Sequence, residues 1–282
     1  MVTSANLASG RKILRRERLA GWTRDELLVA LGLYCTMEFG KFHQRNPRIV
    51  EVAERIGRTP SALAMKLSNL ASLDPVIRES GRRGLEGASK ADRAIWRELE
   101  DSPEQIMPAA EEALVSLSLS EPLFEAECEL VEKGSEPVNY MGEEKLGIAR
   151  QRRGQHIFRK SVLSSYEHRC CVTGIADTRL LVASHIRPWR SDIHNRLNPH
   201  NGLCLSTLYD RAFDLGLITF SEEFRLMVSP SLQKQADNEY MMESFVRREG
   251  QQIALPNKFA PDAKLMAWHR QEYFVDAVTA GL

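Results

Sequence analysis

Residues 180–220 have the sequence LLVASHIRPWRSDIHNRLNPHNGLCLSTLYDRAFDLGLITF, and this stretch decides the fold of the C-terminal half. The apolar run 180–186 predicts a short strand, which Pro188 ends because proline cannot continue a paired strand. A polar loop follows, then a second predicted strand over 201–205 and a helix over 206–214. We therefore expect a strand–loop–strand–helix unit, with a further strand just beyond it.

The side chains that could carry chemistry lie at the ends of these elements. His185 closes the first strand, and a neutral imidazole near its ordinary pKa can accept a proton at pH 7. Asp210 and Asp214 are four residues apart, which places both carboxylates on one helix face. Their hard oxygens favour Mg²⁺ or Mn²⁺ over Zn²⁺. Two structural alternatives stay open: His185 could be a hydrogen-bonded core histidine, and the aspartates could pair with Arg187 or Arg211 on the surface.

Four short segments, in this order along the chain, resemble the HNH or ββα-metal nucleases. They are Cys171-Val172-Thr173-Gly174, Ser184-His185-Ile186-Arg187-Pro188-Trp189, Asn201-Gly202-Leu203 and Phe213-Asp214-Leu215-Gly216-Leu217-Ile218. Together they look like the bacterial HNH endonucleases described as predicted restriction endonucleases. The resemblance implies a ββα-metal domain that hydrolyses DNA with a divalent metal, in restriction or another anti-phage role.

The same resemblance implies a role for each residue of the expected site. His185 matches the general base that activates water, and Asn201 matches the central asparagine whose amide ties down the loop and orients the histidine. Asp210, nine residues after Asn201, occupies the third slot of the pattern, and Asp214 could complete a divalent metal site. A single site of this kind cuts one strand, so double-strand cleavage would need a homodimer or two successive nicks.

The chain departs from the family pattern at two positions. Ser184 stands where a metal ligand often precedes the base, and Tyr209 stands where close relatives carry histidine. These departures favour an alternative, a non-catalytic DNA-binding regulator that retains a degenerate HNH fold. A nuclease directed at RNA ranks last, because the N-terminal part has no exposed series of aromatic residues for stacking bases.

The N-terminal part predicts three helices, over about 23–34, 47–56 and 59–70. The last two flank Gly57 in a helix-turn-helix pattern, since glycine allows the left-handed backbone of a tight turn. Residues 22–26 and 57–61 also resemble the Myb/SANT-like three-helix DNA binders. An ordinary helical bundle is the alternative. The predicted DNA contacts of this part and of the loop after His185 are Arg58, Ser61, Lys66, Asn69, Arg187, Arg190 and Arg196.

Charge is distributed unevenly, although the chain carries 38 basic and 38 acidic residues in total. Residues 1–85 hold 15 basic and 8 acidic residues, residues 86–145 hold 5 and 16, and residues 146–282 hold 18 and 14. Two basic segments thus flank an acidic one, as a phosphate backbone held at both ends would require. We expect an α+β protein of three parts. A DNA-binding helical module covers 1–85, and an acidic, partly helical connector over 86–147 stays in solvent. The nuclease domain covers 148–282 and is flanked by helices.

Composition excludes several other classes of protein. The five cysteines are odd in number and form no Cys-x-x-Cys pair, which argues against a disulfide framework and against a four-thiolate zinc site. No apolar run reaches the roughly 18 residues that span a bilayer. The N-terminus lacks the apolar core of a secretory signal, so we expect a cytoplasmic protein with reduced thiols.

Overall fold

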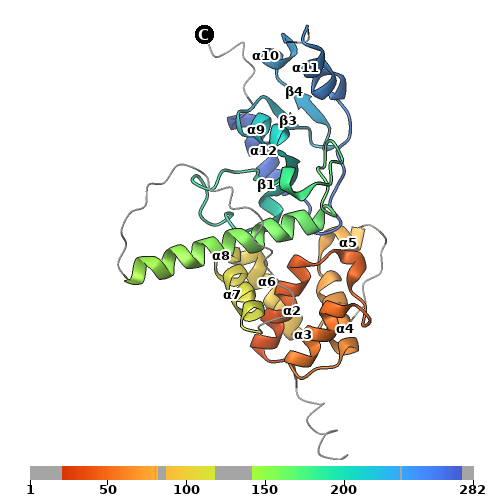
Figure 1. The fold of residues 1–282 in the computed structure, drawn as a ribbon, viewed down its shortest axis with the longest axis vertical. Helices are drawn as coiled ribbons and strands as arrows, with labels where there is room; N and C mark the ends of the chain where they lie inside the picture. Colours follow the sequence, from red (N-terminus) through yellow and green to blue (C-terminus); the bar gives the residue numbers. More distant parts are fainter. Residues whose placement is uncertain (1–20, 80, 82–86, 118–141, 236, 275–282) are drawn as a thin grey trace, which may run out of the picture.

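The computed structural model describes residues 21–79, 81, 87–117, 142–235 and 237–274, with the backbone alone for 142–153. It is a mixed α+β fold with a helical N-terminal half and two small β-hairpins beyond it (Figure 1). The helices of the N-terminal half are α2 (Arg24–Thr36), η1 (Phe39–Lys41), α3 (Pro47–Arg55), α4 (Pro60–Ala71), α5 (Pro75–Glu79), α6 (Lys90–Asp101) and α7 (Pro103–Val115). No helix in these described ranges is long and apolar enough to cross a membrane.

The first three predicted helices are confirmed as α2, α3 and α4. Thr23 caps α2, because its hydroxyl accepts a hydrogen bond from the backbone of Glu26 while the Glu26 carboxylate accepts one from Thr23. Gly57 lies between α3 and α4 with a φ of 67°, the left-handed conformation that glycine adopts without strain. The helix–turn–helix arrangement therefore forms where the sequence predicts it.

The acidic segment packs more closely than its composition suggests. The sequence predicts an exposed connector, but α6 and α7 lie against α2 and complete the N-terminal core through residues such as Trp96 and Met107. One of its carboxylates is buried, since Asp92 accepts a hydrogen bond of 2.6 Å from the ammonium of Lys66 on α4. Much of the described acidic segment is thus a structural part of the helical half. Residues 118–141, the rest of the expected linker and the site of Cys128, lie outside the described residues.

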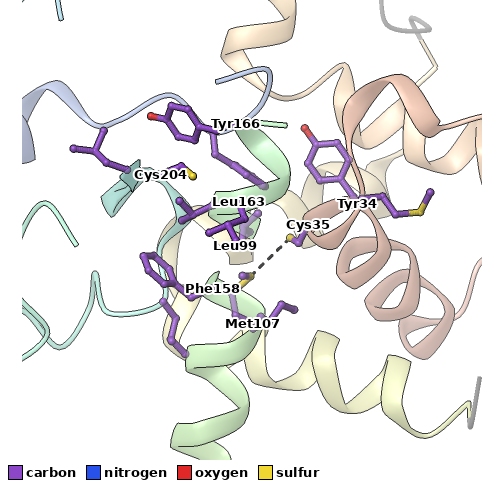
Figure 2. Packing of buried hydrophobic residues seen from close by; sticks show 14 of the residues in the cluster. Tyr34, Cys35, Leu99, Met107, Phe158, Leu163, Tyr166 and Cys204 are labelled. Carbon is purple, nitrogen blue, oxygen red and sulfur yellow. Dashed lines mark hydrogen bonds between the residues drawn. The ribbon is translucent and has the colours of Figure 1, made fainter. Parts of the chain in front are cut away.

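Helix α8 (Gly142–Ser165) joins the two halves. It runs between the N-terminal helices and the first hairpin, packing on α2 and α7 with one part and on β1 and β2 with another (Figure 1). Figure 2 shows Phe158 and Leu163 of α8 between Cys204 of the hairpin and Met107 of α7. Since these side chains are almost fully buried, one continuous apolar core extends across both halves.

The C-terminal half confirms the predicted strand–loop–strand–helix unit. Strands β1 and β2 pair antiparallel, with His185 opposite Gly202 at one end and Leu181 opposite Ser206 at the other. Helix α9 follows at once and packs back against both strands. The elements of this half are η2 (Thr178–Leu180), β1 (Leu181–His185), η3 (Pro199–Asn201), β2 (Gly202–Ser206), α9 (Thr207–Asp214), β3 (Ile218–Phe220), β4 (Leu226–Val228), α10 (Pro230–Gln233), α11 (Glu239–Ser244), η4 (Val246–Arg248) and α12 (Ala263–Glu272).

A segment before α12, residues 254–262, ties the two halves together. Lys258 is fully buried, and its ammonium donates to the carbonyl oxygens of Tyr34, Cys35 and Met37 at 2.7, 3.1 and 2.6 Å. These carbonyls belong to the C-terminal end of α2, where backbone acceptors have no partner within the helix and a cation is favoured. Phe259 follows it into the N-terminal core, with its ring 5.6 Å from that of Tyr34.

Candidate active site

The β1–β2 hairpin offers two faces to its neighbours. Gly202 faces α8 so closely that a Cβ added there would lie 2.3 Å from Val162 and 3.1 Å from Phe158. His185, paired with Gly202 across the hairpin, lies on the same face. Because side chains alternate along a strand, Ser184 points to the opposite face. Glycine at 202 is thus what lets α8 approach the histidine.

His185 is held on three sides. Its ring stacks on that of Phe158, with centroids 4.2 Å apart, and meets the edge of Trp189 at 5.6 Å. Its Nε2 lies 3.0 Å from the carbonyl oxygen of Arg196, and a carbonyl can only accept, so Nε2 carries the proton. Nδ1 is then the basic nitrogen. Among the described residues Nδ1 has no hydrogen-bond partner. It is also not buried, so it is accessible from solvent.

Burial also sets the protonation state of this imidazole. The pKa of His185 lies below its usual value of 6.5, because burial disfavours the charged ring more than the Arg196 carbonyl favours it. The ring is therefore neutral at pH 7. A neutral imidazole with one fixed N–H and one accessible lone pair is the form that a general base requires.

Asn201 fastens the loop that follows His185, here called the site loop (residues 186–201). Its buried amide accepts a hydrogen bond from the backbone N–H of Arg187 at 2.8 Å and donates to the carbonyls of Arg187 and Asn195 at 3.1 and 3.0 Å. The backbone carbonyl of Asn201 accepts a further hydrogen bond from the backbone N–H of Ile186. The side chain thus joins both ends of the loop.

The two aspartates lie on α9, one turn apart. Tyr209, Ala212 and Phe213 form the buried face of this helix, while Asp210 is half-buried beside that face and Asp214 is exposed. The described residues contain no group of three or more His, Cys, Asp and Glu side chains that could hold a metal ion. Helix α9 offers two carboxylates, and Mg²⁺ is commonly held by one or two carboxylates with water and substrate phosphate.

Neither departure from the family pattern supplies a further ligand. Tyr209 is buried against Phe245, and its hydroxyl donates to the carbonyl of Ser244. Burial raises the pKa of Tyr209 to about 12, so the phenol stays protonated. Ser184 is 2% exposed, and its hydroxyl has no hydrogen-bond partner among the described residues.

The arginines of the site loop differ in how firmly they are held. Arg187 lies 4.8 Å above the ring of Trp268 and forms an ion pair of 3.1 Å with Asp192. Arg196 lies over Trp189 and donates from Nε to its carbonyl at 2.7 Å. Arg190 is exposed. The loop therefore carries three cations, two of them pre-positioned by aromatic rings.

The predicted DNA contacts of the N-terminal half are arranged less favourably. Arg58 forms a two-pronged ion pair with Glu26, with both contacts at 2.7 Å, and lies over Trp22. Lys66 is buried against Asp92, and Asn69 is also buried. Only Ser61 of this set is exposed, at the start of α4. The DNA contact predicted for these residues remains a prediction, and the proposals below rest on none of them.

Sequence reasoning missed the groups that hold the histidine. Phe158 supplies the stacking surface and Arg196 supplies the carbonyl that fixes the tautomer. The first is an ordinary apolar position of an amphipathic helix, and the second acts through its backbone, so neither leaves a signal in a short motif. His200 and His269 are structural: Nδ1 of His200 donates to the carbonyl of Ala260, and His269 stacks on Phe213 in the core.

Comparison with known proteins agrees with this geometry. The family model of HNH endonucleases matches residues 170–221. The match includes β1, the site loop, β2, α9 and β3, and it identifies this segment as an HNH endonuclease domain. An HNH domain at these residues suggests nuclease activity on a nucleic acid. No curated protein matches the chain significantly.

Proposed function

We propose that this protein is a metal-dependent DNA endonuclease in which His185 is the general base. The observation that carries the proposal is the state of His185 within an HNH domain: Nε2 is fixed by the carbonyl of Arg196, and Nδ1 is basic and accessible. Asn201 fixes the loop that bears this carbonyl. From the family resemblance, the biological setting would be restriction or defence against phage.

The chemistry follows from these positions. Nδ1 of His185 takes a proton from a water molecule whose oxygen attacks the phosphorus. The bond between phosphorus and the 3′ oxygen breaks, which leaves a 5′-phosphate and a 3′-hydroxyl after the 3′ oxygen gains a proton from solvent. The stacked ring of Phe158 and the edge contact with Trp189 hold the imidazole at one angle, so that its lone pair keeps a constant direction through the reaction.

Asp210 and Asp214 are the residues that would hold the metal. A bound Mg²⁺ or Mn²⁺ would stabilise the negative charge that develops on the phosphate and the departing oxygen. The residues of the chain do the rest: the α9 carboxylates bind the ion, and the cations of the site loop bind flanking phosphates. Arg190 is the most accessible of these cations.

A second candidate function has an observation in its favour. Tyr209 and Ser184 are buried and supply no ligand, as expected of an HNH fold that binds DNA as a regulator without cutting it. This candidate predicts DNA binding that persists in EDTA, with no cleavage under any cation. The accessible base nitrogen of His185 favours the nuclease, because a regulator has no need of one.

The decisive experiment is nicking of supercoiled plasmid, with modified and unmodified bases, in Mg²⁺, Mn²⁺ or EDTA. His185→Ala should lower the rate by roughly 10²–10⁴-fold, the range typical of a lost general base. His194→Ala is the matched control, since His194 is an exposed histidine of the same loop. Equal, metal-independent nicking by all three proteins would refute the proposal. Cleavage of RNA in preference to DNA would refute the choice of substrate.

The metal ligands can be tested separately from catalysis. Binding of Mn²⁺, followed by electron paramagnetic resonance, should weaken at least tenfold in Asp210→Asn with Asp214→Asn. Asp237→Asn, an exposed carboxylate outside α9, should leave binding unchanged. Unaltered Mn²⁺ binding in the double variant would move the metal site elsewhere in the chain.

A further inference from the structure

The site loop presents one large apolar side chain to solvent. Ile193 is 61% exposed, whereas its neighbours Asp192, His194 and Asn195 are polar. Isolated exposed apolar residues are common on proteins and need no explanation by themselves. Two further features distinguish Ile193: the loop around it is tightly cross-linked, and the arginines of the candidate active site belong to the same loop.

Hydrogen bonds between side chains hold the region of Ile193 in shape. The carboxylate of Asp192 accepts from the backbone and the amide of Asn195, at 3.2 and 2.8 Å, and pairs with Arg187. Asn195 in turn accepts from Asn198 at 2.9 Å. A loop secured on both sides of an exposed apolar residue holds that residue outward at little further cost in entropy.

The same loop is suited to a nucleic-acid backbone. Arg187, Arg190 and Arg196 belong to it, and it begins directly after His185. Cations beside a projecting apolar side chain are the features by which proteins hold phosphates and insert a wedge between base pairs, unstacking them and bending the duplex. Insertion beside the cleavage site would also move the scissile phosphate out of the regular helix.

We propose that Ile193 inserts between base pairs of duplex DNA when the site loop binds it. The inference rests on the proposed function for its partner, DNA, and assigns Ile193 as the residue that distorts the substrate. Ile193 is thus a substrate-contacting residue and has no part in proton transfer or metal binding. Its effect is local unwinding of the duplex next to His185.

The test measures unwinding without cleavage and without knowledge of a recognition sequence. Closed circular plasmid is bound by the full chain in EDTA, relaxed by a topoisomerase that needs no metal, and freed of protein. An inserted side chain lowers the twist of bound DNA, so the linking number of the product falls as protein increases. We expect Ile193→Asn, which replaces the apolar side chain with a polar amide, to reduce this change at least threefold while the Kd for DNA changes by less than threefold.

Two controls separate insertion from loss of fold or of binding. Leu180→Asn removes an aliphatic side chain of similar exposure, 48%, at the opposite end of β1, and should unwind DNA as the parent does. Ile193→Met should restore most of the effect. The inference is overturned if the parent chain binds without changing the linking number, if it binds no duplex, or if Ile193→Asn matches the parent. Nicking in Mg²⁺ is scored separately: unwinding that depends on Ile193, without nicking, would refute the nuclease and retain the wedge.

Discussion

Lys258→Met should destabilise the folded protein by about 1 kcal/mol. The substitution keeps the aliphatic stem and removes a donor of three buried carbonyls at the end of α2, but the carbonyl of Cys35 keeps its hydrogen bond from the Ser164 hydroxyl at 2.8 Å. An unsatisfied buried acceptor costs roughly 1–3 kcal/mol, hence about 2–6 for the carbonyls of Tyr34 and Met37 together. Against this, burial lowers the pKa of Lys258 from 10.5 to about 8, so keeping the ammonium charged at neutral pH costs about 3 kcal/mol that methionine avoids. The difference ranges from about −1 to 3 kcal/mol and centres near 1.

Urea unfolding at pH 7, followed by tryptophan fluorescence, measures this loss directly. A loss near 1 kcal/mol should also lower the Tm by about 2–4 °C in a chain of this order of size. Lys264→Met is the control, because Lys264 is exposed on α12. A gain in stability of more than about 1 kcal/mol in Lys258→Met would show that the cost of burying the ammonium outweighs its hydrogen bonds, and would refute the reasoning.

Three further predictions concern protons and backbone. Because burial lowers the pKa of His185, the nicking rate should decline only below pH 6.5, and an acidic limb at or above pH 6.5 would contradict the neutral, buried base. Burial lowers the pKa of His269 to about 4, so between pH 6.5 and 4 the unfolded chain binds a proton that the folded chain excludes. The free energy of unfolding should therefore decrease as the pH is lowered through this window, by up to about 3 kcal/mol. In urea unfolding at pH 7 and pH 5, His269→Gln should lose less stability between the two pH values than the parent chain does. Gly216→Ala should lower the free energy of unfolding at least twice as much as Gly57→Ala in the same assay. Both residues have a φ of 67°, but only at Gly216 would a Cβ meet a backbone oxygen, that of Tyr273 at 1.8 Å. Similar losses at the two glycines would mean that strain alone, about 1–2 kcal/mol, sets the cost.

The sequence predicts those features of the site that depend on local pattern. Alternation and a proline place His185 at a strand end, and a spacing of four places Asp210 and Asp214 on one face of α9. Thr23 and Gly57 mark the helix boundaries they were expected to mark. In each case the decisive interaction joins residues close together in the chain, where propensity and periodicity act.

The rest depends on contacts between distant parts of the chain. The partner of Lys258 is a helix end more than 200 residues away, and nothing in the sequence around residue 258 indicates burial of a charge. The acidic segment was expected in solvent because of its charge, but Asp92 is neutralised by Lys66 and α6 and α7 bury their apolar faces. Helix α8 begins at Gly142, well before the residue at about 155 where its apolar pattern becomes visible.

The lysine that closes the end of α2 also sets an order of events during synthesis. Translation delivers α2 first, and the residue that completes it is number 258 of 282. Until residue 258 is made, the carbonyls of Tyr34 and Met37 have only water in place of its ammonium, and the helical half has a surface where Phe259 will later pack. The N-terminal half therefore reaches its final form only after the whole HNH segment has left the ribosome, and both halves finish folding together.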